Sequence, residues 1–431
     1  MTSKPKPTQA APTQAYVWVW LPGSTDPVVA GLLTAVGQDL QFTYGRSYLT
    51  RQGAIPLYTP ELPLQRGTLP LLNGLPMPNA LRDAAPDAWG RRVILNRKFG
   101  TKGKDIDSAE LDELTFLLES GSDRIGALDF QESAEYYKAR SRGNAPLSEL
   151  LAAAGLVEQG IPLTPDLDRA LFHGSSVGGA RPKASITSDN KNYIAKFSAQ
   201  GDIYSVVKAE YIAMRLAAEA GLMVAHVRME HVVGKDVLLV ERFDREKKGT
   251  AWTRKMMVSA LTLLELDEMM ARYASYEKLA TIIRHRFTDP KDTLRELFSR
   301  MVFNVLCGNT DDHARNHAAF WDGTSPTLTP AYDICPQART GSEANQAMLI
   351  LGEEKQSQIA LCLRAASLFL LNEGEAKAII KELVKVIRDR WDAVCKEAKV
   401  SEVDKNLFWR RQFLNPYAFR DAPTDIAALV E

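Results

Sequence analysis

The pattern of apolar and polar positions separates strand-like from helix-like segments in the first third of the chain. Aromatic and β-branched residues between turn residues predict strands over 15–22 (AYVWVWLP), 40–49 (LQFTYGRSYL) and 123–131 (DRIGALDFQ). Apolar residues at helical spacing predict helices over 85–99 and 108–120. We therefore expect residues 15–132 to form a small α+β unit, in which no catalytic cluster stands out. Residues 1–14, rich in Pro, Thr and Gln, are expected to be a disordered tail.

The pattern changes after a predicted linker over 136–146 and a predicted helix over 147–160. From His173 to about Arg245 the order is loop, strand, helix, strand, after which the chain reads as mainly helical up to Leu306. A polar loop, a predicted hairpin and a helical tail from Lys355 follow. We therefore expect two further units, over residues 145–250 and 251–431.

Composition excludes several classes of protein. The 53 Lys and Arg balance the 53 Asp and Glu, so no net charge draws the chain to nucleic acid or membranes. No apolar run approaches the roughly 18 residues of a membrane helix, and no signal-peptide core or helix-turn-helix pattern is visible. The four cysteines are scattered without a C-x-x-C spacing, which favours reduced thiols over a zinc site. A soluble cytoplasmic protein is expected.

Lys196 is the first residue that predicts chemistry. In the segment NYIAKF it shares a strand face with Ile194, while Tyr193, Ala195 and Phe197 take the other face. The next predicted helix carries an apolar stripe (Ile203, Val206, Val207, Ala213, Met214, Ala217), ends at Gly221 and places Glu210 inside the stripe. A buried ammonium needs an anion, so a Lys196–Glu210 ion pair is expected. The alternative is a solvated lysine on an edge strand and a solvated glutamate at the edge of the stripe.

Two flanking segments could complete a phosphate site. The segment LFHGSSVGGARPKA (171–184) is rich in glycine and ends near Lys183, but it matches neither G-x-G-x-x-G nor G-x-x-x-x-G-K-[ST] and could be an ordinary turn. The segment KDVLLVERFDR (235–245) is an apolar strand that ends in charged residues. Its end is consistent with a hinge that contacts adenine and equally with an ordinary strand terminus.

The most specific signal is GNTDDHARNHAAFW (308–321). Asp311 and Asn316 have the spacing of the kinase catalytic loop, in which the Asp accepts a hydroxyl proton and the Asn binds Mg²⁺. Asp333 follows in PAYDI, at the end of a predicted strand. His313 and His317 suggest H-E-x-x-H, but position 314 is Ala, so the general base is missing. A polar loop with Asx turns does not explain why glycine loop, lysine, acid, hinge, D-x-x-x-x-N and Asp occur in kinase order.

These segments also resemble a known family. The segments SSVGGARPKA, YIAKF, LLVERFDR, GNTDDHARNHAAF and LTPAYDI, with PLQRG, PDAWGRRVI and DRIGALDF upstream, are similar to the HipA family of bacterial serine/threonine kinases, toxins of type II toxin–antitoxin systems. The resemblance spans nearly the whole chain. It implies an α+β, two-lobed, protein-kinase-like fold with an N-terminal α+β subdomain and a mainly helical C-terminal lobe.

The resemblance also implies a role for each matching residue. ATP would be bound by a phosphate-covering loop over Val177–Lys183, by Lys196, by an adenine hinge from Glu241 to Phe243, and by His313 and Arg315 in support. Within the loop, the residues implied to bind ATP are Val177, Gly178, Gly179, Ala180 and Lys183. Asp311 would be the catalytic base, and Asn316 and Asp333 would bind Mg²⁺. Autophosphorylation would fall on Ser176, with Ser175 as a second candidate, and would favour a loop conformation that no longer admits ATP.

The partners implied are a HipB-like helix-turn-helix antitoxin and a protein substrate, which in the family is an aminoacyl-tRNA synthetase. DNA would be contacted only through the antitoxin. Three alternatives remain: AMP transfer on a kinase-like fold, a catalytically silent antitoxin-binding corepressor or scaffold, and a housekeeping kinase. The intact set Lys196, Asp311, Asn316 and Asp333 speaks against catalytic silence.

Overall fold

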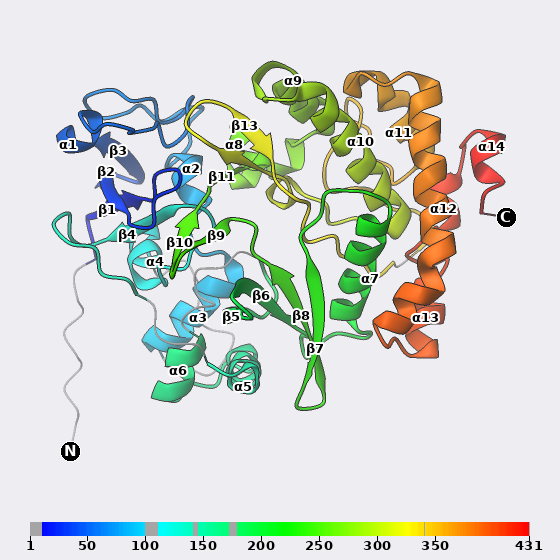
Figure 1. Cartoon of the computed structure of the whole chain (residues 1–431), viewed down its shortest axis with the longest axis horizontal. Helices are drawn as coiled ribbons and strands as arrows, with labels where there is room; N and C mark the ends of the chain where they lie inside the picture. The colour runs from blue at the N-terminus through cyan, green and yellow to red at the C-terminus, as the bar shows by residue number, and fades with distance from the viewer. Residues whose placement is uncertain (1–10, 100–110, 141–144, 172–178, 340, 431) are drawn as a thin grey trace.

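The computed structural model describes residues 11–99, 111–140, 145–171, 179–339 and 341–430. The chain forms a mixed α+β molecule whose sheets occupy one half and whose longest helices occupy the other, with the first strand and the last helix at opposite sides (Figure 1).

The N-terminal unit is built on an antiparallel sheet with the strand order β3-β2-β1-β4. Its strands are β1 (Gln14–Val19), β2 (Val28–Val36), β3 (Asp39–Tyr44) and β4 (Leu128–Gln131). Its helices are α1 (Arg46–Leu49), α2 (Asn79–Arg82), α3 (Ala88–Phe99) and α4 (Glu113–Glu119). The sequence prediction missed β2 and is wrong over 40–49, because the strand ends at Tyr44 and the chain turns at Gly45 into a short helix. It is also wrong over 123–127, which precede β4 as a loop.

A second antiparallel sheet, with the order β5-β6-β8-β7, follows. It comprises β5 (Lys183–Ser188), β6 (Lys191–Phe197), β7 (Val227–Val232) and β8 (Lys235–Glu241). The helices α5 (Leu147–Glu158) and α6 (Pro165–Leu171) precede it, and α7 (Val206–Glu219) is inserted between β6 and β7. The positive φ of 81° at Gly221 ends α7 where the sequence predicted. Ile203, expected in the apolar stripe, lies before the helix and is 85% exposed.

Small strands rather than helices follow β8, contrary to the sequence prediction. They are β9 (Arg245–Lys248), β10 (Ala251–Arg254) and β11 (Met256–Ser259). Strand β11 pairs with the predicted hairpin, β12 (Ala318–Trp321) and β13 (Pro326–Leu328). Asp333 lies five residues beyond β13 rather than at the end of a strand.

The helical tail expected from Lys355 begins at Ile359, and residues 329–339 and 341–358 form loops with isolated bridges. The rest of the chain is helical. It contains α8 (Ala260–Leu263), η3 (Glu268–Tyr273), α9 (Tyr276–Arg286), α10 (Pro290–Cys307), η4 (Ala314–Asn316), α11 (Ile359–Ala365), η5 (Ala366–Phe369), α12 (Glu373–Glu397), α13 (Glu402–Phe408), η6 (Pro416–Phe419) and α14 (Thr424–Ala427). Asn372 and Glu375 start α12 with a reciprocal capping box, and its apolar face is buried. None of the helices in the described ranges is long and apolar enough to cross a membrane.

Besides a small cluster of Ile94, Leu95 and Phe116, two larger apolar cores hold the described parts of the chain together. The larger runs from the N-terminal sheet through α7 and α10 to α12. The smaller combines β5, β6 and β8 with α5 and includes Trp89 and Val93 of α3. Helix α3 therefore packs into the core of the second sheet, although it belongs to the N-terminal unit in sequence.

Candidate functional site

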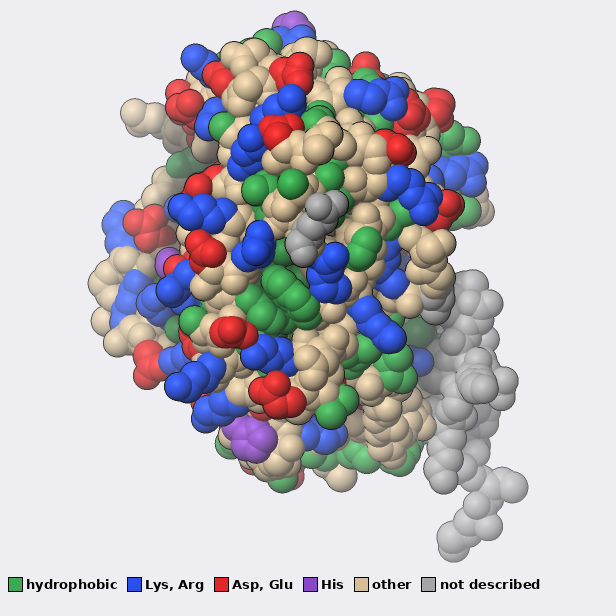
Figure 2. Space-filling view, turned by 90° about the vertical axis from the view of Figure 1, so that its right-hand side faces the viewer, with side chains coloured by type: hydrophobic (Ala, Val, Ile, Leu, Met, Phe, Trp, Pro, Cys, Tyr) green, Lys and Arg blue, Asp and Glu red, His purple; other side chains and the backbone are tan. Residues whose placement is uncertain are grey.

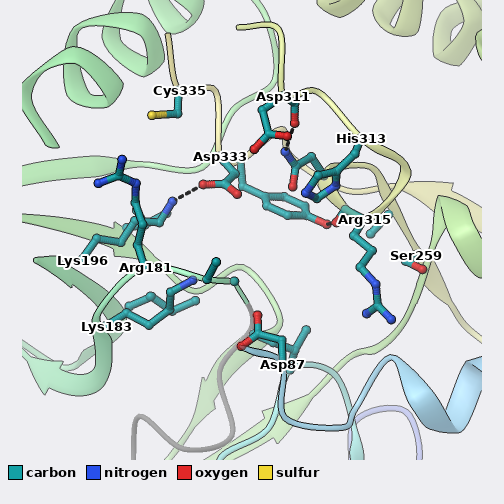
Figure 3. Close-up of a pocket in the computed structure, with 18 of the residues that line it drawn as sticks. Asp87, Arg181, Lys183, Lys196, Ser259, Asp311, His313, Arg315, Asp333 and Cys335 are labelled. Carbon is teal, nitrogen blue, oxygen red and sulfur yellow. Dashed lines mark hydrogen bonds and ion pairs between the residues drawn. The ribbon is translucent and has the colours of Figure 1, made fainter. Parts of the chain in front are cut away.

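A cavity of about 450 Å³ lies where the three parts of the chain meet. One wall is the second sheet with α7, the opposite wall is the loop after α10, and a third wall comes from the N-terminal unit. Figure 3 shows the charged side chains that converge on it from these walls.

Lys196 stands between two carboxylates in this cavity. Its Nζ lies 2.5 Å from Glu210 Oε1 on α7 and 2.5 Å from Asp333 Oδ1. The alternation along β6 buries Tyr193, Ala195 and Phe197 and turns Lys196 to the cavity. Burial alone would lower the pKa of Lys196, but the charges of Asp333 and Glu210 outweigh it, so the pKa lies above its usual value. The lysine is therefore held charged.

Asp333 connects Lys196 to the opposite wall. Burial would raise its pKa, but the neighbouring ammonium groups of Lys196 and Lys183 hold the pKa below the usual range. Its carboxylate is 38% exposed and faces the cavity. A φ of 59° places its backbone in the left-handed region, which costs a non-glycine residue free energy and is often found at functional sites.

Lys183 lies directly opposite Lys196 across the β5–β6 pair, so two ammonium groups line the same cavity. Gly179 and Ala180 line it as well. The other predicted residues of the glycine-rich loop, Ser175, Ser176, Val177 and Gly178, lie outside the described residues.

The loop after α10 carries Asp311 and Asn316. Gly308 ends α10 in the left-handed conformation, with a φ of 71°. Asn316 Nδ2 donates to the carbonyl of Asp311 at 3.2 Å, which fixes the two residues relative to each other. Burial raises the pKa of Asp311, and the charge of Asp333 adds to this while His313 opposes it. A carboxylate with a raised pKa is a stronger base than an ordinary solvated carboxylate, and it therefore accepts a proton more readily.

A buried cluster behind this loop was missed by the sequence analysis. His317 Nε2 lies 2.9 Å from Asp312 Oδ1, and Tyr276 at the start of α9 donates to the same carboxylate. His317 therefore points into the protein, whereas His313 lines the cavity. The two histidines do not face one site, which disfavours a zinc site of the H-E-x-x-H type. The sequence places Asp311 and Asp312 side by side, and nothing in it indicates that Asp312 would be the buried one.

The segment after β8 forms the back of the cavity. Glu241 and Phe243 both line it, and the Phe243 ring packs against Tyr332 at 5.7 Å between ring centroids. Between and beyond them, Arg242 and Asp244 are buried and paired at 2.8 Å. Arg242 also reaches Asp123 at 2.9 Å, so this segment is tied to the N-terminal unit by charge.

The third wall comes from the N-terminal unit, in which the sequence showed no catalytic cluster. Asp83, Asp87 and Ile125 line the cavity from this side. Ser259 and Thr262 donate to the Asp83 carboxylate at 2.6–2.7 Å, so Asp83 holds β11 and α8 in place. Only the tertiary packing of α3 brings Asp87 to the cavity, which explains why no sequence signal marked it. Arg315 lies on the same side and pairs with Glu268 at 3.3 Å.

The site suits a nucleoside triphosphate with a hard divalent cation. Mg²⁺ usually binds through one or two protein oxygens together with phosphate oxygens. The Asn316 amide and the exposed Asp333 carboxylate line one cavity and offer this donor set. Lys196 and Lys183 supply positive charge for phosphate oxygens on the sheet side of the cavity.

Comparison with known proteins places the chain. The model of the HipA N-terminal domain matches residues 19–131, and that of the HipA-like C-terminal domain matches 175–391. "Putative kinase Y4mE" of Sinorhizobium fredii is 24% identical over 323 residues, covering 69% of this chain and 72% of the relative. "Serine/threonine-protein kinase toxin HipA" of Shewanella oneidensis is 25% identical over 188 residues, covering 37% of this chain and 42% of the relative.

The fold agrees with these matches. HipA in a solved complex with HipB and operator DNA, from Shewanella oneidensis, superposes with a TM-score of 0.66 at 18% identity, over 97% of this chain and 96% of that one. This confirms the predicted α+β, two-lobed, kinase-like fold. Because the C-terminal family model alone matches half of the chain and the N-terminal model matches most of the rest, the chain belongs to the HipA family.

Proposed function

We propose that this protein is an ATP- and Mg²⁺-dependent serine/threonine-protein kinase. The observation that carries the proposal is the cavity in which Lys196, held by Glu210 and Asp333, faces the loop of Asp311 and Asn316. Kinase names among the relatives support the same activity class.

Each side chain has a defined task in this proposal. Lys196 and Lys183 bind phosphate oxygens, and the segment Glu241–Phe243 holds the adenine, with Phe243 as an apolar surface. Gly179, Ala180, His313 and Arg315 line the same cavity and complete the nucleotide site. Asn316 and Asp333 would hold Mg²⁺, which neutralises charge on the phosphates. Asp311 accepts the proton of the substrate hydroxyl while the hydroxyl oxygen forms a bond to the γ-phosphorus of ATP. The bond between this phosphorus and the oxygen that bridges it to the β-phosphate breaks, and ADP is released.

The toxin role extends the proposal beyond chemistry. One relative is named a kinase toxin, and the matching solved structure contains HipA with HipB and operator DNA. These names support a HipB-like antitoxin as a partner and growth inhibition as the outcome. Figure 2 shows basic and acidic side chains interspersed on the face of α12–α14. Mixed charge is unlike the basic stripe of a DNA-binding surface, so this face does not favour direct DNA contact. DNA contact through the antitoxin stays a proposal from the family resemblance. An aminoacyl-tRNA synthetase remains the proposed substrate on family resemblance.

Intact mass after incubation with ATP and Mg²⁺ tests the reaction. Wild-type protein should gain one phosphate on Ser176 or Ser175, the acceptors that the family resemblance implies, and replacement of both serines by Ala should abolish the gain. Asp311→Asn keeps the shape but removes the base, so it should lower transfer by at least about 100-fold. A gain of AMP would overturn the reaction in favour of nucleotide transfer. If the protein binds ATP but neither its own mass nor the mass of added purified synthetases changes, the catalytically silent corepressor is favoured.

A further inference from the structure

Helix α3 of the N-terminal unit lies behind the phosphate side of the cavity. Trp89 and Val93 are buried in one core with Ala184, Ala195 and Leu239 of the second sheet. Trp89 is 1% exposed. A residue that is remote in sequence is thus part of the lobe that carries Lys183 and Lys196.

Trp89 holds both ends of the segment that leaves the glycine-rich loop. Its backbone N–H donates to the carbonyl of Gly179 at 3.2 Å. Its indole Nε1 donates to the carbonyl of Lys183 at 2.9 Å. Gly179 has a φ of 107°, and a Cβ at this position would collide with Lys183 Nζ. Lys183 Nζ therefore folds back onto Gly179, and one residue, Trp89, bonds both ends of the segment Gly179–Lys183, whose middle is held by the Arg181–Asp202 ion pair.

Asp87, two residues before Trp89, supplies charge to Lys183. Burial lowers the pKa of Lys183, and the charge of Lys196 lowers it further, while Asp87 opposes both. Asp87 Oδ1 is itself buried, without a hydrogen-bond partner in the described part of the chain. Glu210 and Asp333 pair directly with Lys196, whereas Asp87, whose Oδ2 lies beside Lys183 Nζ at Gly179, is the carboxylate with the largest effect on Lys183.

The turn that carries Asp87 is held in place by α4. Arg91 donates through Nε to the carbonyl of Pro86 at 3.0 Å, and its Nη2 bonds both oxygens of Glu113 at 2.7 Å. The Arg91 N–H donates to the Asp87 carbonyl at 2.8 Å. Asp87 is therefore presented to the cavity by a rigid support.

We propose that Asp87 and Trp89 are positioning residues of the nucleotide site, which hold Lys183 and the segment Gly179–Lys183 against the triphosphate. The inference rests on the proposed kinase function. It makes the N-terminal unit a working part of the phosphate site.

Binding of a non-hydrolysable ATP analogue with Mg²⁺, compared with binding of adenosine, tests this role by calorimetry. Asp87→Asn should weaken the analogue by about 10-fold, the worth of one charge-assisted contact, and leave adenosine binding unchanged, because adenosine has no phosphates. If Asp87 only repelled phosphate, the same change would tighten the analogue and overturn the proposal. Glu132→Gln removes an exposed carboxylate of the same unit and should change neither Kd.

Two further variants separate positioning from loss of folding. Trp89→Phe keeps an aromatic ring in the core but loses the bond to the Lys183 carbonyl, so the folded protein, measured well below its Tm, should bind the analogue about 5-fold more weakly. In a Lys183→Met background, Asp87→Asn should have no further effect. Equal losses with and without Lys183 would overturn the proposal, as would equal Kd values for wild type and Asp87→Asn. A wild-type protein that binds no ATP analogue would overturn the proposed function itself.

Discussion

At Lys196, one ammonium group compensates two carboxylates that come from different lobes. Glu210 is 3% exposed and is fixed on α7, whereas Asp333 is 38% exposed and faces the cavity. The buried partner cannot move to solvent, so Glu210 sets the position of the ammonium. The open partner remains accessible to a ligand that enters the cavity.

We expect Glu210→Gln to lower phosphoryl transfer by about 100-fold, because a mispositioned lysine loses electrostatic stabilisation of the transferring phosphate. Steady-state kinetics with saturating ATP measures this as a fall in kcat. Glu219→Gln, at the solvent end of the same helix, is the control and should leave kcat unchanged. A normal kcat in Glu210→Gln would contradict the positioning role of this pair.

Single residues were predictable where a local pattern marks them. Strand alternation placed Lys196 on the opposite face from Tyr193 and Phe197, and helical periodicity placed Glu210 inside α7. Asp312 and Asp87 carry no such mark. Asp312 is buried only because Tyr276 from α9 and His317 close over it, and Asp87 reaches the cavity only because α3 packs on the second sheet.

At the scale of elements, strands in a regular alternating context were easier to predict than those set by tertiary contacts. β6 and β8 agree with their sequence patterns, whereas β9 consists of charged residues, β10 is only four residues long, and both were predicted to lie in a helical region. Strand β4 is buried on both faces, including the carboxylate of Asp129. That burial is possible because Arg124 and Arg140 each approach Asp129 Oδ1 to 2.8 Å.

The contribution of the buried Asp129 on β4 to the free energy of unfolding should fall over a defined range of acidic pH. Burial raises the pKa of Asp129, but Arg140 and Arg124 outweigh it and lower the pKa to about 2. An unfolded Asp titrates near 3.9, so the contribution of Asp129 to stability is complete above about pH 4 and is lost as the pH falls towards 2. Asp129→Asn should cost about 3 kcal/mol at pH 7, because Arg124 is left buried without its partner.

Denaturant titration at pH 7 and pH 3 measures this difference. The gap in unfolding free energy between wild type and Asp129→Asn should narrow at pH 3. Asp26→Asn, on the exposed turn between β1 and β2, should match wild type at both values. A gap of the same size at pH 3 would show that the charge of Asp129 is not its source.

At the scale of the whole molecule, buried charges connect the N-terminal unit to the segment after β8. Asp123 accepts from Arg242 at 2.9 Å and from Arg245 at 3.1 Å. The backbone N–H of Gly126 donates to Asp244 at 2.8 Å. Burial raises the pKa of Asp123, but the two arginines outweigh it and hold the pKa below the usual range. The N-terminal unit and the lobe behind the cavity are therefore one structural body at this point.

Asp123→Asn should lower the stability of the whole chain by about 3 kcal/mol, because it leaves two buried guanidinium groups with one carboxylate fewer. Scanning calorimetry should record a Tm lower by several degrees. Glu132→Gln, which removes an exposed carboxylate nearby in sequence, serves as the control. A Tm equal to that of wild type would show that the remaining contacts alone hold the two parts together.

The contacts between the N-terminal unit and the rest of the chain also limit which HipA-family chains can exchange their N-terminal units. A crossover anywhere between residues 131 and 179 would join Asp123, Asp87 and Trp89 from one parent to Arg242, Lys183 and Gly179 from another. We expect hybrids to fold and bind nucleotide only when the two parents carry matching residues at these positions. Exchange of N-terminal units among relatives would then be restricted to pairs whose two halves have changed together.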